Sequence, residues 1–151
     1  MKELILFLYY LCMAAPHLNI DPDDCSAIGL LILKYIDEYE LTFTKMAERI
    51  GISRAALRIA CLKQGNPGKK TVPKLASVLN CTEPEICRMI CENKLRQIYE
   101  DNDDSVNSTL EAIDSFVKII YKQIESVPEK ENPNEYDIYQ HALKSVTKLP
   151  G

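Results

Sequence analysis

Positively charged side chains are concentrated in one part of this 151-residue sequence, between residues 41 and 82. That segment has a net charge of +7, because Glu48 is its only acidic residue and its eight basic residues are Lys45, Arg49, Arg54, Arg58, Lys63, Lys69, Lys70 and Lys74. Residues 1–40 have a net charge of -5 and residues 83–151 one of -6, so the whole chain has -4. Such a local excess of positive charge is typical of a surface that binds a polyanion. The alternative is a solvated surface on which charges cluster by chance.

The other reactive residue types form no catalytic pattern. His17 and His141 are isolated, and no serine or cysteine has a nucleophile motif around it. The six cysteines include no C-x-x-C pair and match no zinc spacing; Cys87 and Cys91, four residues apart, would share a helix face. We expect most cysteines to be small buried residues in a reducing cytosol, with a metal site or disulfides as the alternative. The sequence therefore predicts no enzyme, no metal and no other cofactor.

The elements that must position the cations are predicted to be helices. The chain is 46% hydrophobic and 26% charged, which suits a folded core, and its five glycines and lack of tryptophan argue against an all-β fold. Apolar residues recur with a helical period, and no segment alternates as a strand does. Capping boxes at Thr82–Glu85 and Ser108–Glu111 predict helices from about residues 83 and 109. Asn132 and Pro133 are expected to begin the last helix.

The first 15 residues superficially resemble a secretory signal. Glu3 cancels the charge of Lys2, the apolar run is too short to span a membrane, and the apolar residues also form a helical stripe. We expect a buried N-terminal helix in a cytoplasmic protein, with export as the alternative. Residues 28–36 are apolar on more than one face, so residues 3–15 are expected to pack on the second face.

The basic segment has the pattern of two short helices joined by a tight turn. Thr42 can cap a helix that buries Met46, Ala47 and Ile50, and Gly51 follows where a left-handed conformation is favourable. Ser53 can cap the next helix, whose Leu57, Ala60 and Cys61 would face the core. The solvent-facing residues of that second helix would be Arg54, Ala55, Arg58 and Ile59. This is the pattern of a helix-turn-helix.

The segment resembles the phage lambda repressor-like (XRE-type) helix-turn-helix family, through "LTFTKMAERIGIS" and "NPGKKTVPKLASVLNCTEPEI". With residues 27–39 as first helix, the resemblance covers residues 25–90. It implies an all-α domain that binds double-stranded DNA, in a transcriptional regulator that acts as a repressor and a homodimer. The implied base contacts are Arg54, Ala55, Arg58 and Ile59. The implied phosphate contacts are Thr42, Thr44, Lys45, Lys63, Asn66 and Lys69.

The sequence also departs from the family pattern. Ala55 and Ala56 replace a more usual polar pair, and the apolar Phe43, Ile59 and Leu62 stand where the family is commonly polar or charged. Ile59 could contact a thymine methyl group. Alternatively, Phe43, Ile59 and Leu62 could form an apolar patch for a protein partner. The alternative function is therefore a phage-type, anti-CRISPR-like inhibitor that binds protein.

Residues 1–24 are expected to form an added N-terminal helix and linker, and residues 91–151 a helical region for dimerisation or partner binding. The second region contains a stripe with heptad spacing, made of Leu110, Ile113, Val117, Ile120 and Ile124. This stripe could be a dimer seam, or it could pack against another helix of the same chain.

Overall fold

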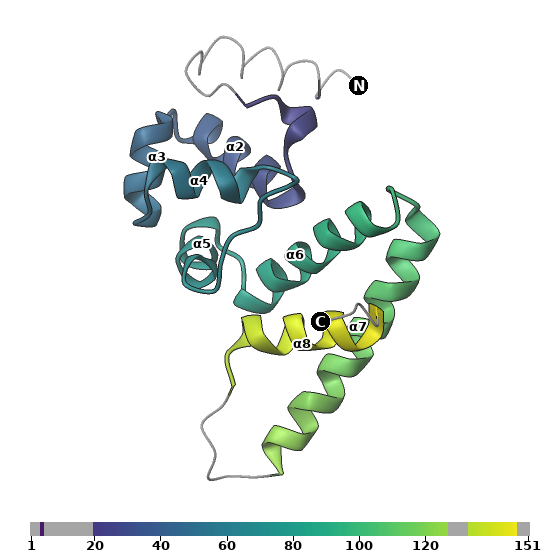
Figure 1. Ribbon diagram of the computed structural model, residues 1–151. Helices are drawn as coiled ribbons and strands as arrows, with labels where there is room; N and C mark the ends of the chain where they lie inside the picture. Colours follow the sequence, from purple (N-terminus) through teal and green to yellow (C-terminus); the bar gives the residue numbers. More distant parts are fainter. Residues whose placement is uncertain (1–3, 5–19, 127–132, 148–151) are drawn as a thin grey trace. The chain divides into compact units, whose positions relative to one another are not determined.

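The computed structural model describes Leu4, residues 20–126 and residues 133–147. In these residues it contains seven α-helices, one short 3-10 helix and no β-strand, so the expected all-α class is confirmed. Figure 1 shows η1 (Pro22–Asp24), α2 (Ala27–Glu38), α3 (Phe43–Ile50), α4 (Arg54–Cys61), α5 (Thr71–Leu79), α6 (Glu83–Ile98), α7 (Asp103–Glu125) and α8 (Glu135–Thr147). Apart from Leu4, the expected helix at residues 3–15 lies outside the described residues, as does Asn132. None of the described helices is long and apolar enough to cross a membrane.

The chain divides into two compact units, Met1–Cys81 (unit 1) and Thr82–Gly151 (unit 2). The sequence placed a domain boundary between residues 90 and 91, which falls inside α6. The division lies earlier because α6 continues unbroken from Glu83 to Ile98 and packs against α7 and α8. The whole of α6 therefore belongs with the C-terminal helices.

Side-chain caps fix where the helices of unit 1 begin. In α2, α3 and α4 the capping hydroxyl accepts a hydrogen bond from the backbone N–H three residues later, and the caps are Ser26, Thr42 and Ser53. Each cap satisfies one of the backbone donors that a helix leaves unpaired at its start. The caps predicted at Thr42 and Ser53 are thus confirmed.

The core of unit 1 forms where α2 crosses α4 and α5, with α3 packed on α4 and α5. Its fully buried side chains include Ile32, Leu57 and Leu75. Gly29 permits the closest approach, because a Cβ atom there would lie 2.1 Å from the backbone oxygen of Cys61. The crossing of α2 and α4 thus requires a residue without a side chain at this position.

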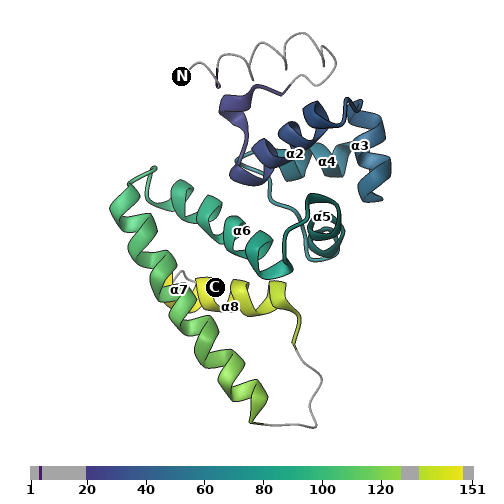
Figure 2. The ribbon, with the colours of Figure 1, turned by 180° about the vertical axis from the view of Figure 1, so that it is seen from behind.

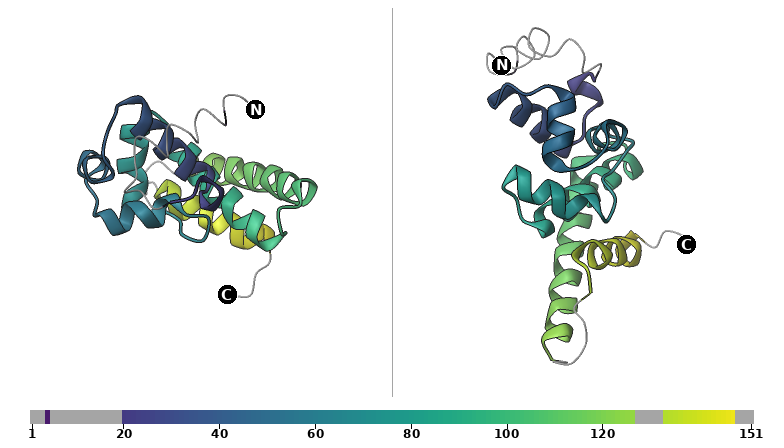
Figure 3. Two further views of the ribbon diagram at one scale, coloured as in Figure 1. Left: turned by 90° about the horizontal axis from the view of Figure 1, so that it is seen from above. Right: turned by 90° about the vertical axis from the view of Figure 1, so that its left-hand side faces the viewer.

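Unit 2 is built from α6, α7 and α8, each packed against the other two. Figure 2 shows α8 lying across α6 and α7, and Figure 3 shows these helices from two further directions. The long helix α7 contributes Val106 and Ile113 to the core, and α6 contributes Ile86 and Ile90, all fully buried.

Two of the predicted helix starts in unit 2 require correction. The capping box of Thr82 and Glu85 is present and begins α6 as expected, but Ser108 lies inside α7. Asn102 caps α7 instead by accepting a hydrogen bond from the Ser105 N–H at 3.1 Å. The last helix begins at Glu135, so Pro133 precedes it rather than occupying its first position.

Candidate nucleic-acid interface

The connection between α3 and α4 is a tight turn that starts at a left-handed glycine. Gly51 has φ 86°, and its N–H donates to the carbonyl oxygens of Ala47 at 2.9 Å and Glu48 at 3.1 Å. The Ile52 N–H donates to the Ala47 carbonyl at 3.0 Å. These bonds close the end of α3, and Ser53 then opens α4 by accepting from the Ala56 N–H at 3.0 Å. The direction in which α4 leaves the turn is therefore fixed by local hydrogen bonds.

Helix α4 has one buried and one exposed face. Leu57, Ala60 and Cys61 are fully buried, as the sequence predicted. The opposite face is exposed and carries the four candidate base contacts, Arg54, Ala55, Arg58 and Ile59. The structure thus brings two guanidinium groups and two small or branched apolar groups together on one solvent-facing surface. A guanidinium can bind a phosphate or the edge of a guanine, and an apolar group can contact a thymine methyl.

The exposed Ile59 of α4 also lies against the loop that follows this helix. It is 52% exposed, yet its Cγ2 atom would lie 3.0 Å from a Cβ atom added at Gly65. The same added atom would lie 2.4 Å from the Ile59 carbonyl oxygen. The loop therefore folds closely over the C-terminal turn of α4, and only glycine fits at residue 65.

The candidate phosphate contacts lie on the first turn of α3 and on the loop between α4 and α5. Thr42, Thr44 and Lys45 are exposed around the N-terminus of α3, although the Thr42 hydroxyl also caps that helix. On the loop, Lys63 and Lys69 are exposed and Asn66 is half-buried. These residues belong to the same unit as the exposed face of α4.

Two other basic residues of the segment have structural partners that sequence reasoning missed. Lys74 of α5 donates to the carbonyl oxygen of Gly51 at 3.1 Å and so ties α5 to the turn. Arg49 donates to the hydroxyl of Tyr35 at 3.1 Å and lies over the rings of Tyr35 and Tyr39. No local sequence signal could have found these contacts, because each joins residues brought together only by the packing of α2, α3 and α5.

The apolar patch expected at Phe43, Ile59 and Leu62 is not present as an exposed surface. Phe43 is only 8% exposed, because it is the first residue of α3 and shares the buried face of Met46, Ala47 and Ile50. Leu62 is half-buried and forms an isolated antiparallel bridge with Cys25. Of the three, Ile59 alone is exposed, so the expected patch is corrected to a single residue.

Most of the apolar residues in the heptad stripe of α7 are buried within unit 2. Leu110, Ile113 and Val117 are at most 4% exposed, whereas Ile120 and Ile124 are half-buried. The helices that α7 packs against are α6 and α8 of the same chain. The first three residues of the expected dimer seam are therefore core residues, which agrees with the alternative of packing within the chain.

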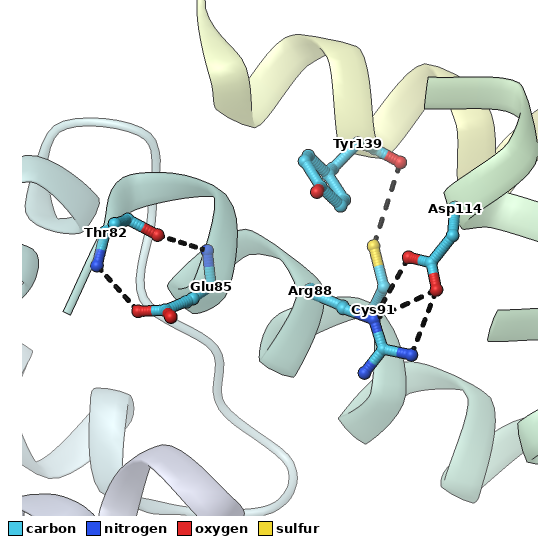
Figure 4. A network of polar contacts seen from close by, with 6 residues as sticks. All are labelled: Thr82, Glu85, Arg88, Cys91, Asp114 and Tyr139. Carbon is cyan, nitrogen blue, oxygen red and sulfur yellow. Dashed lines mark hydrogen bonds and ion pairs between the residues drawn. The ribbon is translucent and has the colours of Figure 1, made fainter. Parts of the chain in front are cut away.

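Polar contacts also join the helices of unit 2 (Figure 4). Arg88 of α6 binds both carboxylate oxygens of Asp114 on α7, with Nε 3.0 Å from Oδ1 and Nη2 3.1 Å from Oδ2. This ion pair and its hydrogen bonds raise the pKa of Arg88. Lys94 of α6 donates to Gln140 Oε1 of α8 at 2.6 Å, and burial lowers its pKa. These pairs fix the register of the three helices and lie outside unit 1.

Four of the five cysteines in the described residues are buried and held in their protonated form. Burial raises the pKa of Cys25 to about 11 and those of Cys61, Cys87 and Cys91 to about 12. A protonated thiol is a poor nucleophile and a poor metal ligand. In the part of the chain that the structure describes, no group of three or more His, Cys, Asp or Glu residues could hold a metal ion.

Comparison with known proteins identifies no relative. No family model matches the chain, and searches of curated proteins and of solved structures find no match.

Proposed function

We propose that unit 1 is a helix-turn-helix module of the lambda repressor-like type, and that the chain is a cytoplasmic regulator that binds double-stranded DNA. The observation that carries the proposal is the exposed face of α4. It presents Arg54 and Arg58 one helical turn apart on a helix whose start is fixed by Gly51 and Ser53. In a helix-turn-helix, the second helix enters the major groove and its N-terminal residues contact the bases.

The chemistry of this face favours particular base pairs. Arginine is the most common specific partner of guanine, because its guanidinium can bind O6 and N7 together, and each good pair contributes about 1–3 kcal/mol of discrimination. Ala55 and Ile59 have no polar group to offer and suit thymine methyl groups. We therefore expect a site in which guanine and thymine are read by α4.

The start of α5 supports a role in holding the DNA backbone. This helix has no side-chain cap, and Lys69 and Lys70 immediately precede it. The N-terminus of a helix carries partial positive charge, which favours phosphate, although the N–H groups of Thr71 and Val72 already donate to the Gly68 carbonyl oxygen at 3.0 and 3.2 Å. Together with Lys45 on α3, these residues provide sequence-independent contacts on both sides of the α4 face.

A dimer would place two α4 helices about 34 Å apart, which matches one turn of a near-palindromic site. The proposal does not assign the dimer contact to the α7 stripe, since Leu110, Ile113 and Val117 are buried in unit 2. The protein-binding alternative loses most of its support for a similar reason, because Phe43 is buried and Leu62 half-buried.

Charge reversal at α4 tests the proposal. Arg54→Glu/Arg58→Glu should abolish binding to duplex DNA in a fluorescence anisotropy titration, because two attractive contacts become repulsive in the groove. The matched control is Lys118→Glu/Lys122→Glu, which reverses two exposed basic residues with the same spacing on α7. The control should retain binding that weakens steeply with salt.

Both variants change only exposed residues, so their circular dichroism spectra and melting temperatures should match those of the wild type. Equal binding by the two charge-reversal variants, or no duplex binding by the wild-type protein, would overturn the proposal.

A further inference from the structure

The acidic segment before α2 is attached to the C-terminal end of α4. We call residues Asp21–Ser26, which include η1, the acidic clip. The Ser26 N–H donates to the Cys61 carbonyl oxygen at 2.9 Å, and the Lys63 N–H donates to the Asp24 carbonyl oxygen at 2.9 Å. Cys25 and Leu62 pair between these two bonds as an antiparallel bridge. The clip is therefore held, residue by residue, against the end of α4 and the start of the loop that follows it.

The clip brings negative charge close to the candidate phosphate contacts. Asp21, Asp23 and Asp24 are all exposed, and the Asp21 carboxylate accepts a hydrogen bond from the Asp23 N–H at 2.9 Å. The pKa of the buried Cys25 thiol depends on the charges around it. Burial raises this pKa most, Asp24 and Asp21 raise it further, and Lys63 lowers it. The Asp21 and Asp24 carboxylates and the Lys63 ammonium thus lie near the same point of unit 1.

We propose that Asp21 and Asp24 act as fixed counter-charges beside the α4–α5 loop, and that they limit how tightly unit 1 binds DNA of any sequence. This inference rests on the proposed function. A phosphate that approaches Lys63 must also approach the two carboxylates, so part of the attraction is cancelled at that end of α4. Arg54 lies at the opposite, N-terminal end of α4, whereas the clip pairs with residues 61–63. The clip therefore weakens sequence-independent binding more than base contact, and it raises the ratio of specific to non-specific affinity.

The test is the affinity of the full chain for a labelled random-sequence duplex. Asp21→Asn/Asp24→Asn removes two negative charges, keeps the size of both side chains, and leaves a side-chain oxygen at residue 21 that can accept from the Asp23 N–H. We expect the variant to bind about threefold to fivefold more tightly than the wild type at about 50 mM salt. This is the gain expected when two unit negative charges about 10 Å from a DNA phosphate in water are removed. The gain should become small near about 200 mM salt, where such interactions are screened.

The matched control is Asp101→Asn/Asp104→Asn. It changes the net charge of the chain by the same amount, and both residues are exposed in unit 2. Asparagine tolerates the left-handed conformation of residue 101, where φ is 61°. If the clip acts locally, the control should bind as the wild type does.

Equal tightening by both double variants would show an effect of total charge and overturn the inference, and so would no tightening by the clip variant. If the wild type binds duplex DNA in either case, the proposed function survives. If the wild type binds no duplex, the proposed function itself fails. Should the double variant melt early, Asp21→Asn and Asp24→Asn can be measured separately, each with about half of the effect on a logarithmic scale.

Discussion

Individual side chains in this protein are divided clearly between those that hold the fold and those that are available to a partner. Of the eight basic residues of the 41–82 segment, Arg49 donates a hydrogen bond to Tyr35 and Lys74 donates one to Gly51, both within unit 1. Arg54 and Arg58, in contrast, stand on the exposed face of α4. A count of positive charge therefore overstates the number of cations that can reach a phosphate.

The buried thiols predict how stability depends on pH. The pKa of Cys61 and that of Cys91 are raised from 9.0 to about 12, mainly by burial, so the folded chain holds these protons more tightly than the unfolded chain does. Their contribution is fully present below pH 9 and is lost as the pH rises towards 12. Between these values we expect the free energy of unfolding to fall by at most about 1.4 kcal/mol per pH unit for each thiol.

Urea unfolding measured between neutral and alkaline pH checks this expectation. Cys61→Ala should reduce the loss of unfolding free energy that unit 1 shows at alkaline pH, and Cys91→Ala should do the same for unit 2. Each variant starts from a lower stability, because the substitution creates a cavity. A stability that is constant through this range would contradict the burial of the thiols.

The helices differ in how far their limits follow from the sequence. The starts of α3, α4 and α6 were predictable, because Thr42, Ser53 and Thr82 cap through contacts within a few residues. The start of α7 was not, because two capping signals compete there. Asn102 prevails over Ser108 since the earlier start places Asp103 and Asp104 in the first turn and brings Val106 into the core. Such a choice depends on packing against other helices.

The candidate site was predictable to a similar extent. The exposed face of α4 follows from its helical period, since Leu57, Ala60 and Cys61 define the opposite face. The same reasoning applied to α3 would have placed Phe43 inside with Met46, Ala47 and Ile50; comparison with a family pattern led instead to an exposed patch. The clip could not have been predicted, because nothing local in residues 21–26 indicates that they pair with residues 61–63.

The crossing of α2 and α4 depends on the absence of a side chain at Gly29. Gly29→Ala would force a Cβ atom to within 2.1 Å of a backbone oxygen, and backbone cannot rotate away as a side chain can. We expect unit 1 to lose about 3 kcal/mol of stability, at the upper end of overpacking effects. The measurement is chemical denaturation followed by circular dichroism.

Gly68→Ala is the matched control, because a Cβ atom there would meet nothing within 4 Å. It should be neutral or stabilise the protein by up to about 1 kcal/mol, through the reduced entropy of the unfolded chain. Similar losses in both alanine variants would show that the close approach at Gly29 does not limit stability.

The molecule as a whole combines unit 1, which has a basic face, with unit 2, which has a net negative charge, and each unit has its own core. In unit 2, Arg88 and Asp114 join α6 to α7 through a bidentate ion pair whose side chains are partly exposed to solvent. We expect Asp114→Asn to lower the stability of unit 2 by about 1 kcal/mol, the upper range for such exposed pairs. DNA affinity, which the proposal assigns to unit 1, should not change.

A double-mutant cycle with Arg88→Gln measures the interaction itself, and the anisotropy titration of the same variants measures DNA affinity. A loss of DNA affinity in the Asp114 variant would show that binding depends on unit 2, contrary to the proposal.

The anchoring of α4 has a consequence for how this protein could change over evolutionary time. Because Leu57, Ala60 and Cys61 hold the helix from one side, Arg54, Ala55 and Arg58 can be replaced at little cost in stability, and new binding preferences can arise through single substitutions. Residue 65 does not have this freedom, since a Cβ atom there would meet the backbone carbonyl oxygen of residue 59 whatever the side chain at 59 is. Natural variants should therefore diversify first at positions 54, 55 and 58, while Gly65 remains glycine.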